Sequence, residues 1–497
     1  MTMNRLMINE DCTNFFFYHN LKPGKSGEIL DRYIDTIAGT GPGILLINTN
    51  ARRTNYQSQV WETFWEGFDP HGPDSQPALA SVPAGDRAKW RMLIGNMQIL
   101  SRDGIDYPAR AIERCRGSGS SPWIGLRMND VHYNDIPSHP FHGTFWTRNP
   151  QFKRQGTDGY FADALDYAHP EVRDYYMRLI QETLARYDVD GLELDFLREP
   201  YLFSAGKEPE GRRILTDWLG EIRELVTATA AERHHPIQLG IRVPSVMATA
   251  VALGMDVPAW LARGFPDILV VTPRWATTEF DLPLAEWRRI LQGTKTQLAG
   301  GLEVRYQPMP DGPASLMTPE LAIGLAASVL HDGGDFVYLF NYFQDGHPGW
   351  SRSVYQATLR AMTSLATLQA LPRHHAITYR DIIGPNESYR PPLPVTGKEL
   401  SWTMATGPTP PADWVCELVI ETSAAADDSG AKLKVTVEDA GCSFLRVKET
   451  GEGKRVVEFA VPTAALRGTG HSVISIRSTT GQELTVTRVE IHLHPLQ

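Results

Sequence analysis

Two carboxylates stand two residues apart in a short apolar segment near the middle of the chain. Residues 187–198 read Tyr-Asp-Val-Asp-Gly-Leu-Glu-Leu-Asp-Phe-Leu-Arg, so Glu193 and Asp195 alternate with apolar side chains. In a β-strand, successive side chains point to opposite faces, which places both carboxylates on one face. Carboxylates at the end of a strand can act as nucleophile, base or acid in hydrolysis. Glu193 and Asp195 are therefore the first candidates for a catalytic site.

The elements that position these carboxylates alternate regularly between strand and helix over the first 370 residues. Strands are predicted at residues 5–11, 43–50, 122–129, 191–197, 237–244, 268–273, 297–305 and 336–343. Helices are predicted at residues 27–38, 171–187, 211–233, 258–263, 284–291, 319–331 and 353–371. This alternation predicts a parallel sheet closed into a (β/α)₈ barrel. A doubly wound open sheet is the alternative, but it would usually carry a glycine-rich phosphate turn after an early strand, and the sequence has none.

A second domain is predicted after residue 371, where short alternating runs replace helices. These runs lie at residues 414–421, 431–437, 455–461, 471–478 and 484–492. Such a pattern is typical of an antiparallel β-sandwich. We therefore predict a catalytic barrel over residues 1–371 and an accessory β-sandwich over 372–497. Long loops are expected after the second strand (56–83) and the third strand (130–165).

Strand alternation predicts a ring of polar side chains that face the barrel interior. Its members are Asn9, Asp11, Asn48, Asn50, Arg127, Asn129, Glu193, Asp195, Arg242, Glu303, Arg305 and Asn341. Buried charges must be paired, so we expect Glu193 to be held between Arg127 and Arg242, one layer below the barrel mouth. Asp195 lies two residues further along the strand, roughly 6.6 Å nearer the mouth. This position favours Asp195 as the reacting group.

A second reacting carboxylate is predicted at Glu303, near the end of the seventh strand. Glycoside hydrolysis uses two carboxyl groups, and the distance between them separates retention from inversion. In this scheme Asp195 is nucleophile or base and Glu303 is the general acid, with Asp11 and Asp130 in reserve. The distance itself is left open by the sequence. A structural alternative exists for each residue, because Asp195 could cap a loop or pair with Arg198, and Glu303 could pair with a nearby arginine.

Residues suited to sugar binding are predicted around the same mouth. Flat rings can stack on sugar C–H faces, and ring-bearing residues in or near the loops are Trp61, Trp65, Phe141, Phe145, Trp146, Trp275, Tyr306, Tyr342 and Trp350. The predicted substrate-binding residues are Asn50, Arg127, Asn129, Asp130, His132, Arg242, Trp275 and Asn341. An oligosaccharide or glycoside is therefore the expected partner.

The segment from Asp190 to Phe196 resembles the DG-x-x-x-D pattern on the fourth strand of several glycoside hydrolase clans. In the α-galactosidase and α-glucosidase groups, the matching aspartate is the nucleophile, which implies that role for Asp195. Together with residues 166–173, the segment resembles the "family 10-like" glycosyl hydrolases more closely. The pattern departs from chitinase-type barrels, since Leu197 stands where those enzymes have their catalytic glutamate. It also lacks the Asn-Glu pair of the large retaining clan, so the resemblance does not assign the acid.

Two other functions are compatible with the sequence. His132, Asp135, His139 and His142 lie in the loop after the third strand and could form the site of a metal-dependent hydrolase. Their spacing matches no recognised ligand pattern, so the favoured reading has no metal and no cofactor. A non-catalytic carbohydrate-binding barrel is the third hypothesis, and saccharide binding without turnover would distinguish it.

Composition agrees with a globular enzyme. The 497 residues are 42% hydrophobic and 21% charged, with a net charge of −10. No basic run predicts nucleic-acid binding, and no apolar run is long enough to span a membrane. The four cysteines are scattered without metal-type spacing. The first residues contain no signal-peptide pattern, which predicts a cytoplasmic protein, and assembly into a homo-oligomer is left open.

Overall fold

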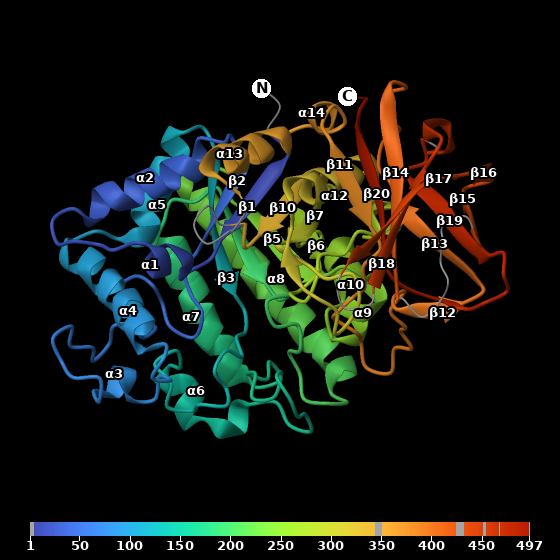
Figure 1. Ribbon diagram of the computed structural model, residues 1–497. Helices are drawn as coiled ribbons and strands as arrows, with labels where there is room; N and C mark the ends of the chain where they lie inside the picture. Colours follow the sequence, from blue (N-terminus) through green and yellow to red (C-terminus); the bar gives the residue numbers. More distant parts are fainter. Residues whose placement is uncertain (1–3, 343–349, 424–431, 451–453, 467, 497) are drawn as a thin grey trace. The chain divides into compact units, whose positions relative to one another are not determined.

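The computed structural model describes residues 4–342, 350–423, 432–450, 454–466 and 468–496. Eight parallel strands form a closed barrel in the order β1-β10-β7-β6-β5-β4-β3-β2 (Figure 1). The barrel strands are β1 (Leu6–Glu10), β2 (Ile44–Asn48), β3 (Ser121–Arg127), β4 (Gly191–Asp195), β5 (Gln238–Pro244), β6 (Ile268–Thr272), β7 (Gln297–Glu303) and β10 (Phe336–Phe340). The predicted (β/α)₈ barrel is thereby confirmed. Residue 343 of the eighth predicted strand lies outside the described residues.

The chain divides into two compact units. The first comprises Met1–Val271, Ile290–Gln297 and Phe340–Gly346, and the second comprises Thr272–Arg289, Leu298–Leu339 and His347–Gln497. The first unit therefore holds β1 to β5 and nearly all of β6, and the second holds most of β7, most of β10 and the C-terminal strands. The domain boundary expected at residue 371 stays a prediction.

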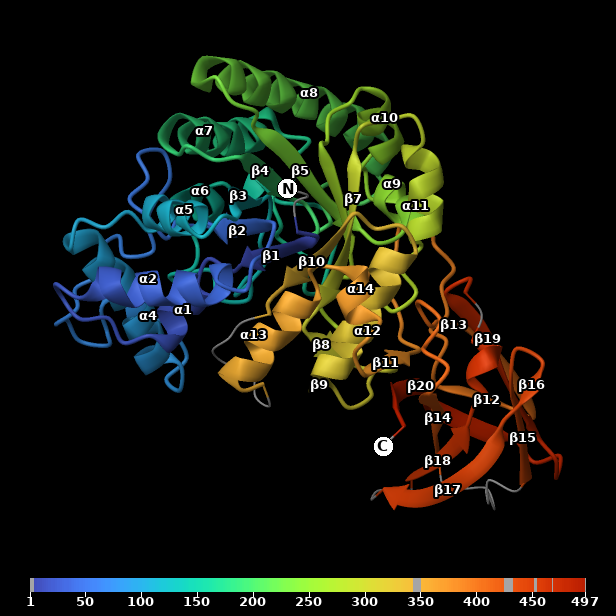
Figure 2. The same ribbon diagram turned by 90° about the horizontal axis from the view of Figure 1, so that it is seen from above.

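Helices follow most barrel strands, as the alternation predicts. They are α1 (Asn14–Tyr18), α2 (Ser26–Ala38), α3 (Pro77–Ala80), α4 (Arg87–Arg102), α5 (Tyr107–Gly117), α6 (Thr144–Arg148), α7 (Pro170–Arg186), α8 (Glu208–Arg233), α9 (Met247–Ala252), α10 (Val257–Ala262), α11 (Leu284–Leu291), α12 (Pro319–His331), α13 (Arg352–Ala361) and α14 (Leu365–Leu368). In the first unit, α5 packs against α2, β2 and β3, while α7 and α8 pack together on the outside of the strands (Figure 2). Asp106 caps α5 by accepting a hydrogen bond from the backbone N–H of Ala109 at 3.1 Å.

The register between β3, β4 and β5 sets the layers inside the first unit. Arg127 pairs with Asp195, and Asp195 pairs with Arg242, so these three residues share one level of the sheet. Glu193 pairs with two glycines, Gly125 and Gly240, one level below. Successive levels are two residues apart along each strand, so the side chains of both levels point to the same face of the sheet.

Trp123 fills the level beneath Glu193. Its ring is completely buried and lies over β4 and β5, where two glycines leave room for it. A Cβ atom on Gly191 would lie only 2.2 Å from the nearest atom of the Trp123 ring, and one on Gly240 would lie 2.9 Å from it. Gly191 of the sequence motif is therefore a packing residue that supports the layers above it.

Replacing Gly191 with alanine is expected to destabilise the fold by about 1–3 kcal/mol, because the new methyl group overpacks the Trp123 ring. Urea unfolding followed by tryptophan fluorescence measures this change. A matched control is Gly117→Ala, since a Cβ atom there meets nothing within 4 Å. Trp123→Phe should recover part of the lost stability in the Gly191→Ala background. Equal stability of Gly191→Ala and Gly117→Ala would contradict this packing.

Two antiparallel sheets follow in the second unit, which confirms the predicted β-sandwich region. One sheet has the order β11-β20-β14-β18-β17, with β12 paired to β20, and the other has the order β13-β19-β15-β16. Their strands are β11 (Arg373–Ala376), β12 (Val395–Gly397), β13 (Glu399–Ala405), β14 (Trp414–Ser423), β15 (Leu433–Val437), β16 (Ala440–Gly441), β17 (Ser443–Thr450), β18 (Lys454–Ala460), β19 (His471–Ser478) and β20 (Leu484–Pro495). Residue 431, which begins a predicted strand, lies outside the described residues. A short hairpin of β8 (Arg305–Tyr306) and β9 (Ser315–Leu316) also belongs to this unit.

Candidate active site

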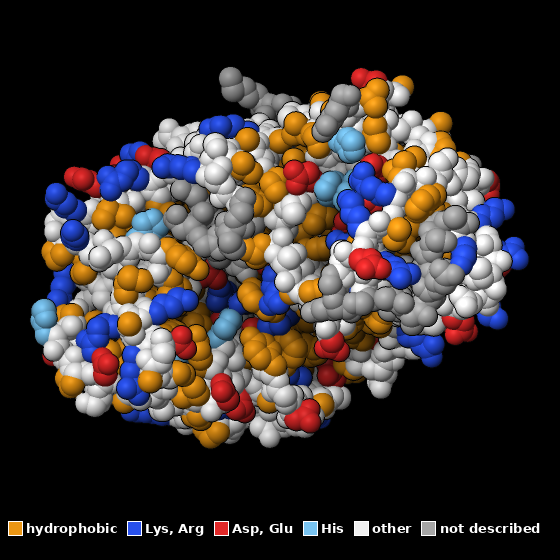
Figure 3. Space-filling model, viewed as in Figure 1, with side chains coloured by type: hydrophobic (Ala, Val, Ile, Leu, Met, Phe, Trp, Pro, Cys, Tyr) orange, Lys and Arg blue, Asp and Glu red, His pale blue; other side chains and the backbone are white. Residues whose placement is uncertain are grey.

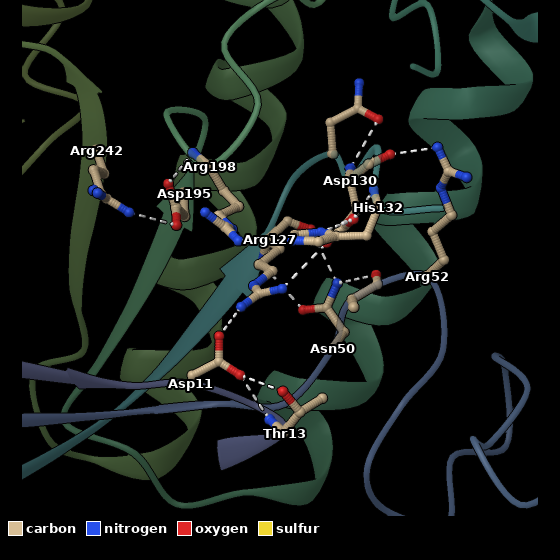
Figure 4. A network of polar contacts seen from close by, with 12 residues as sticks. Asp11, Thr13, Asn50, Arg52, Arg127, Asp130, His132, Asp195, Arg198 and Arg242 are labelled. Atoms are coloured by element: carbon tan, nitrogen blue, oxygen red, sulfur yellow. Dashed lines mark hydrogen bonds and ion pairs between the residues drawn. The ribbon is translucent and has the colours of Figure 1, made fainter. Parts of the chain in front are cut away.

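The C-terminal ends of β1, β3, β4 and β5 bring together acidic and basic side chains, with Arg52 joining them from the loop after β2 (Figure 4). We call this group the charged cluster. Its members are Asp11, Arg52, Arg127, Asp130, His132, Asp195, Arg198, Glu199 and Arg242. All of them belong to the first unit. The C-terminal end of the strands is where (β/α)₈ enzymes place their chemistry.

Arg127 joins two carboxylates within the charged cluster. Its guanidinium donates to Asp11 through Nη2 and to Asp130 Oδ2 at 3.2 Å through Nη1. The backbone N–H and hydroxyl of Thr13 also donate to Asp11, at 2.8 and 2.7 Å. Burial opposes the charge on Asp11, but Arg127 and Thr13 outweigh it and lower the pKa of this carboxyl. The three acidic and basic groups are therefore held in their charged forms.

Asp130 fixes the ring of His132. Its Oδ1 accepts hydrogen bonds from the backbone N–H of His132 at 2.9 Å and from ring Nδ1 at 2.7 Å. Burial would raise the pKa of Asp130, yet His132, Arg127 and Arg198 together hold it well below its usual value. Arg198 Nη2 lies 3.0 Å from Nε2 of the same imidazole. Because a guanidinium can only donate, Nε2 accepts and Nδ1 bears the ring proton.

Three potential metal ligands of the charged cluster lie close together. One ligand atom each from Asp130, His132 and Glu199 falls within 4.8 Å of the others. However, both ring nitrogens of His132 are already hydrogen-bonded, and Arg127 pairs with Asp130. The guanidinium groups already supply the positive charge that a cation would bring. These residues therefore fit a metal ion poorly.

The other histidines of the loop do not join His132 in a shared site. His142 binds Arg52 Nη1 through Nδ1 at 2.7 Å and the carbonyl of Tyr133 through Nε2 at 2.9 Å. His139 stacks on the Tyr133 ring at 3.8 Å. Burial lowers the pKa of His139 to about 4 and, with Arg52, that of His142 to about 3. His139 and His142 thus make contacts within the loop and Asp135 is exposed, and a metal site in this loop stays an alternative.

Asp195 lies deeper than the sequence suggested. It is fully buried, and its Oδ1 accepts from the backbone N–H groups of Leu197 at 3.0 Å and Arg198 at 2.8 Å. Its Oδ2 accepts from Arg242 Nη1 at 3.0 Å. The chain turns back over Asp195 immediately after β4, so this carboxylate is covered at the strand end. Asp195 caps the loop after β4 through its bonds to the N–H groups of Leu197 and Arg198, as the structural alternative described.

The expected clamp of Glu193 between Arg127 and Arg242 stays a prediction, and the printed partners of these residues lie elsewhere. Arg127 and Arg242 lie at the level of Asp195, where Arg242 also packs 4.0 Å above the Phe340 ring. Glu193 instead accepts a hydrogen bond from Asn9 Nδ2 at 3.0 Å. The register of β3, β4 and β5 separates Glu193 by one level from Arg127 and Arg242. Glu193 is thus a buried interior carboxylate one level below the charged cluster.

Two of the three asparagines predicted to bind sugar hold the loops. Asn50 donates to the carbonyl of Arg127 at 3.0 Å and accepts from its N–H at 3.1 Å, which joins the ends of β2 and β3. Asn129 donates to the carbonyl of Leu165 at 2.8 Å and accepts from its N–H at 3.1 Å. Both side chains are almost completely buried. The carboxamides therefore fix the beginning and end of the long loop after β3.

Three predicted site residues, Glu303, Trp275 and Asn341, come from later segments of the chain than the charged cluster. Glu303 belongs to the second unit, is 1% exposed, and accepts from the N–H of Val304 at 3.1 Å. The backbone N–H of Trp275 donates to Asp381 Oδ2 at 3.0 Å within that same unit. Asn341 belongs to the first unit and adopts a left-handed conformation with φ of 62°. The pairing of Asp195 with Glu303 stays a prediction.

Most of the aromatic residues expected to stack on sugars are packed within the protein. Trp61 stacks on Tyr175 at 4.2 Å, and Trp146 lies between His142 and Lys153. Only three of the nine remain half-buried, namely Trp65, Phe145 and Trp275. Loop packing therefore explains most of this aromatic content.

Three members of the charged cluster were missed as site residues by sequence reasoning. Arg198 and Glu199 directly follow the fourth strand, and Arg52 follows the second. Each is at least nine-tenths buried, which is uncommon for these residue types unless they are paired. Charged residues within four positions of a strand end were the available signal.

On the face viewed in Figure 3, basic and acidic side chains are interspersed. Among the residues with assigned positions, no helix is long and apolar enough to cross a bilayer.

No protein-family model and no curated protein sequence matches this chain. Among solved structures, it is similar to α-L-fucosidase isoenzyme 2 from Paenibacillus thiaminolyticus, with 13% identity and a TM-score of 0.44 over 74% of this chain and 50% of that one. It is also similar to the maltogenic α-amylase AmyB from Thermotoga neapolitana, with 11% identity and a TM-score of 0.39 over 96% and 99% of the two chains. A third is the chitinase ChiW from Paenibacillus sp. str. FPU-7, with 10% identity and a TM-score of 0.42 over 98% of this chain and 54% of that one. The chain thus spans about half the length of the fucosidase and the chitinase.

Proposed function

We propose that the protein is a glycoside hydrolase whose reaction takes place at the C-terminal ends of the barrel strands. The observation that supports this most directly is the charged cluster. It gathers ionised carboxylates and an oriented imidazole from several strand ends, where barrel enzymes place their catalytic groups. Charges at this depth are costly to bury, so a fold without a function for them would gain by apolar packing.

In the proposed reaction, the carboxylates stabilise the positive charge that develops on the sugar. Asp195 is the nucleophile or base of the two-carboxylate scheme, and Glu303 is the acid that protonates the leaving oxygen. Acidic and basic members of the cluster largely balance one another. A neutral glycoside is therefore the preferred substrate class, and the scheme needs no cofactor.

A panel of 4-nitrophenyl glycosides and plant and algal oligosaccharides tests the proposal. We expect at least one compound to be hydrolysed, with a rate per milligram of total protein that rises with enzyme purity across independent preparations. The kcat/KM of that compound is then measured. Asp195→Asn protein purified identically serves as the background. Saccharide binding in calorimetry without any turnover would instead identify a non-catalytic carbohydrate-binding barrel.

A further inference from the structure

His132 is held in a form that suits one proton-transfer role. Its Nδ1 proton is directed at Asp130, and its Nε2 has no proton because Arg198 donates to it. An imidazole in this state can take a proton at Nε2, and the resulting positive charge is stabilised by the carboxylate behind Nδ1. The side chain of His132 is 31% exposed, whereas that of Asp130 is 0% exposed. The imidazole is therefore the more accessible member of the pair, although Arg198 now contacts its Nε2.

Asp195 is less suited to the same role. Its two oxygens already accept three hydrogen bonds, from Leu197, Arg198 and Arg242, and it is completely buried. Donors of the protein therefore already occupy both oxygens of this carboxylate, and none of the three bonds involves a substrate. The charge of Asp195 remains useful, since it can stabilise positive charge on the anomeric carbon.

We infer that His132 is the catalytic base that activates water in the proposed glycoside hydrolysis, and that Asp130 is its positioning residue. A water bound at Nε2, in the place of Arg198, gives its proton to that nitrogen while its oxygen bonds to the anomeric carbon. The bond from that carbon to the glycosidic oxygen breaks, and the leaving oxygen takes a proton from the carboxylic acid that serves as the general acid of the proposed scheme. Direct attack by water inverts the anomeric configuration.

The charged groups around His132 come from three parts of the first unit. Asp130 precedes it in the same loop, Arg198 and Glu199 follow β4, and Arg127 ends β3. Arg127 and Asp130 belong to one chain of ion pairs that reaches Asp11. This network fixes Asp130 and, through it, the orientation of the imidazole. The inference rests on the proposed function and gives the role of the base to His132 in place of Asp195, whose charge then stabilises the developing positive charge.

Kinetics of a His132→Ala variant test the inference on whichever 4-nitrophenyl glycoside of the panel is hydrolysed fastest. We expect kcat to fall by about 10²–10⁴-fold, the usual contribution of a general base. Added imidazole should restore part of the turnover, which a purely structural role would not allow. The matched control is His235→Ala, whose ring pairs with Asp188 on the surface. Near-normal turnover of His132→Ala would overturn the inference and leave the proposed function standing.

Three further measurements separate the remaining outcomes. Proton NMR of the first product should show inversion, and retention overturns the assignment of His132.

Histidine ¹⁵N spectra of the wild-type protein, assigned by difference from His132→Gln, should show a protonated Nδ1 and an unprotonated Nε2. The opposite tautomer overturns the assignment of His132 without any activity assay. Loss of turnover on chelation, restored by Zn²⁺ or Mn²⁺, would make Asp130, His132 and Glu199 metal ligands instead. Absence of turnover on every glycoside overturns the proposed function together with the inference.

Discussion

Turnover is expected to fall by at least about 10²–10³-fold when Asp195 is replaced with asparagine, the usual loss on removing one preorganised charge-stabilising group. Asparagine has the same size, and its Oδ1 can still accept from the N–H groups of Leu197 and Arg198. The substitution removes the negative charge at the end of β4 together with its ion pair to Arg242, because the amide nitrogen cannot accept from that guanidinium. The kcat and kcat/KM on the best glycoside of the panel measure the effect.

A matched control lies in the same motif. Asp190→Asn removes a carboxylate that is 38% exposed and pairs with Arg116 at the surface, so its kinetics should stay near those of the wild type. Thermal unfolding of both variants must show a folded protein at the assay temperature. Near-normal turnover of Asp195→Asn would exclude this residue from the reaction.

Chemical rescue distinguishes the roles that Asp195 could have. Azide can replace a missing carboxylate nucleophile, and the product is then a glycosyl azide. With His132 as the base, Asp195 only stabilises charge, so we expect Asp195→Ala to form no glycosyl azide. A glycosyl azide would instead identify Asp195 as the nucleophile and the enzyme as retaining.

The fold was predictable because each barrel strand bears its own signal. Apolar alternation and flanking turns placed all eight strands, and the structure shortens them by only a few residues at their ends. Strand β17 (Ser443–Thr450) was missed because it is exposed along its whole length, so it lacks the alternation of a half-buried strand. The alternation of apolar and polar residues therefore detects strands that are buried on one face, and it does not detect a strand that is exposed on both.

The register between strands was not predictable, and this changed the partners of the site. Alternation gives the face on which a side chain lies but not its level relative to neighbouring strands. Arg242 pairs with Asp195, and Arg127 pairs with Asp11 and Asp130, whereas the sequence suggested Glu193 as the partner of both arginines. The loops were a second source of error, since Asp195 is covered by the turn directly after β4, and Asn129 is covered by a hydrogen bond to the distant Leu165.

Replacing Arg127 with methionine is expected to lower the free energy of unfolding by about 3–5 kcal/mol at pH 7. Methionine is similar in length, but it leaves the buried carboxylates of Asp11 and Asp130 without the cation that joins them. Urea unfolding monitored by circular dichroism measures the loss. The matched control, Arg116→Met, removes a half-exposed arginine that pairs with Asp188 and Asp190, and it should cost no more than about 1 kcal/mol.

The pH dependence of this loss follows from the charge on Asp11. In the wild type its pKa is lowered, so its contribution to stability is present above the unfolded value, near pH 4, and disappears as the pH falls through the lowered value. Without Arg127, burial becomes the main influence and raises the pKa of Asp11. Protonation of this carboxyl as the pH falls then removes its buried charge and restores part of the stability of the variant. The stability difference between wild type and Arg127→Met should therefore be smaller at pH 5 than at pH 7.

A second substitution tests the same cause from the acidic side. Asp11→Asn in the Arg127→Met background removes one of the two uncompensated charges, so it should recover part of the lost stability and flatten the pH dependence. In the wild-type background, Asp11→Asn should destabilise instead, because it breaks an intact pair. Opposite signs in the two backgrounds would establish that the ion pair of Arg127 and Asp11 holds this part of the charged cluster together. The same sign in both would show that packing of the arginine side chain, rather than its charge, is what the barrel needs here.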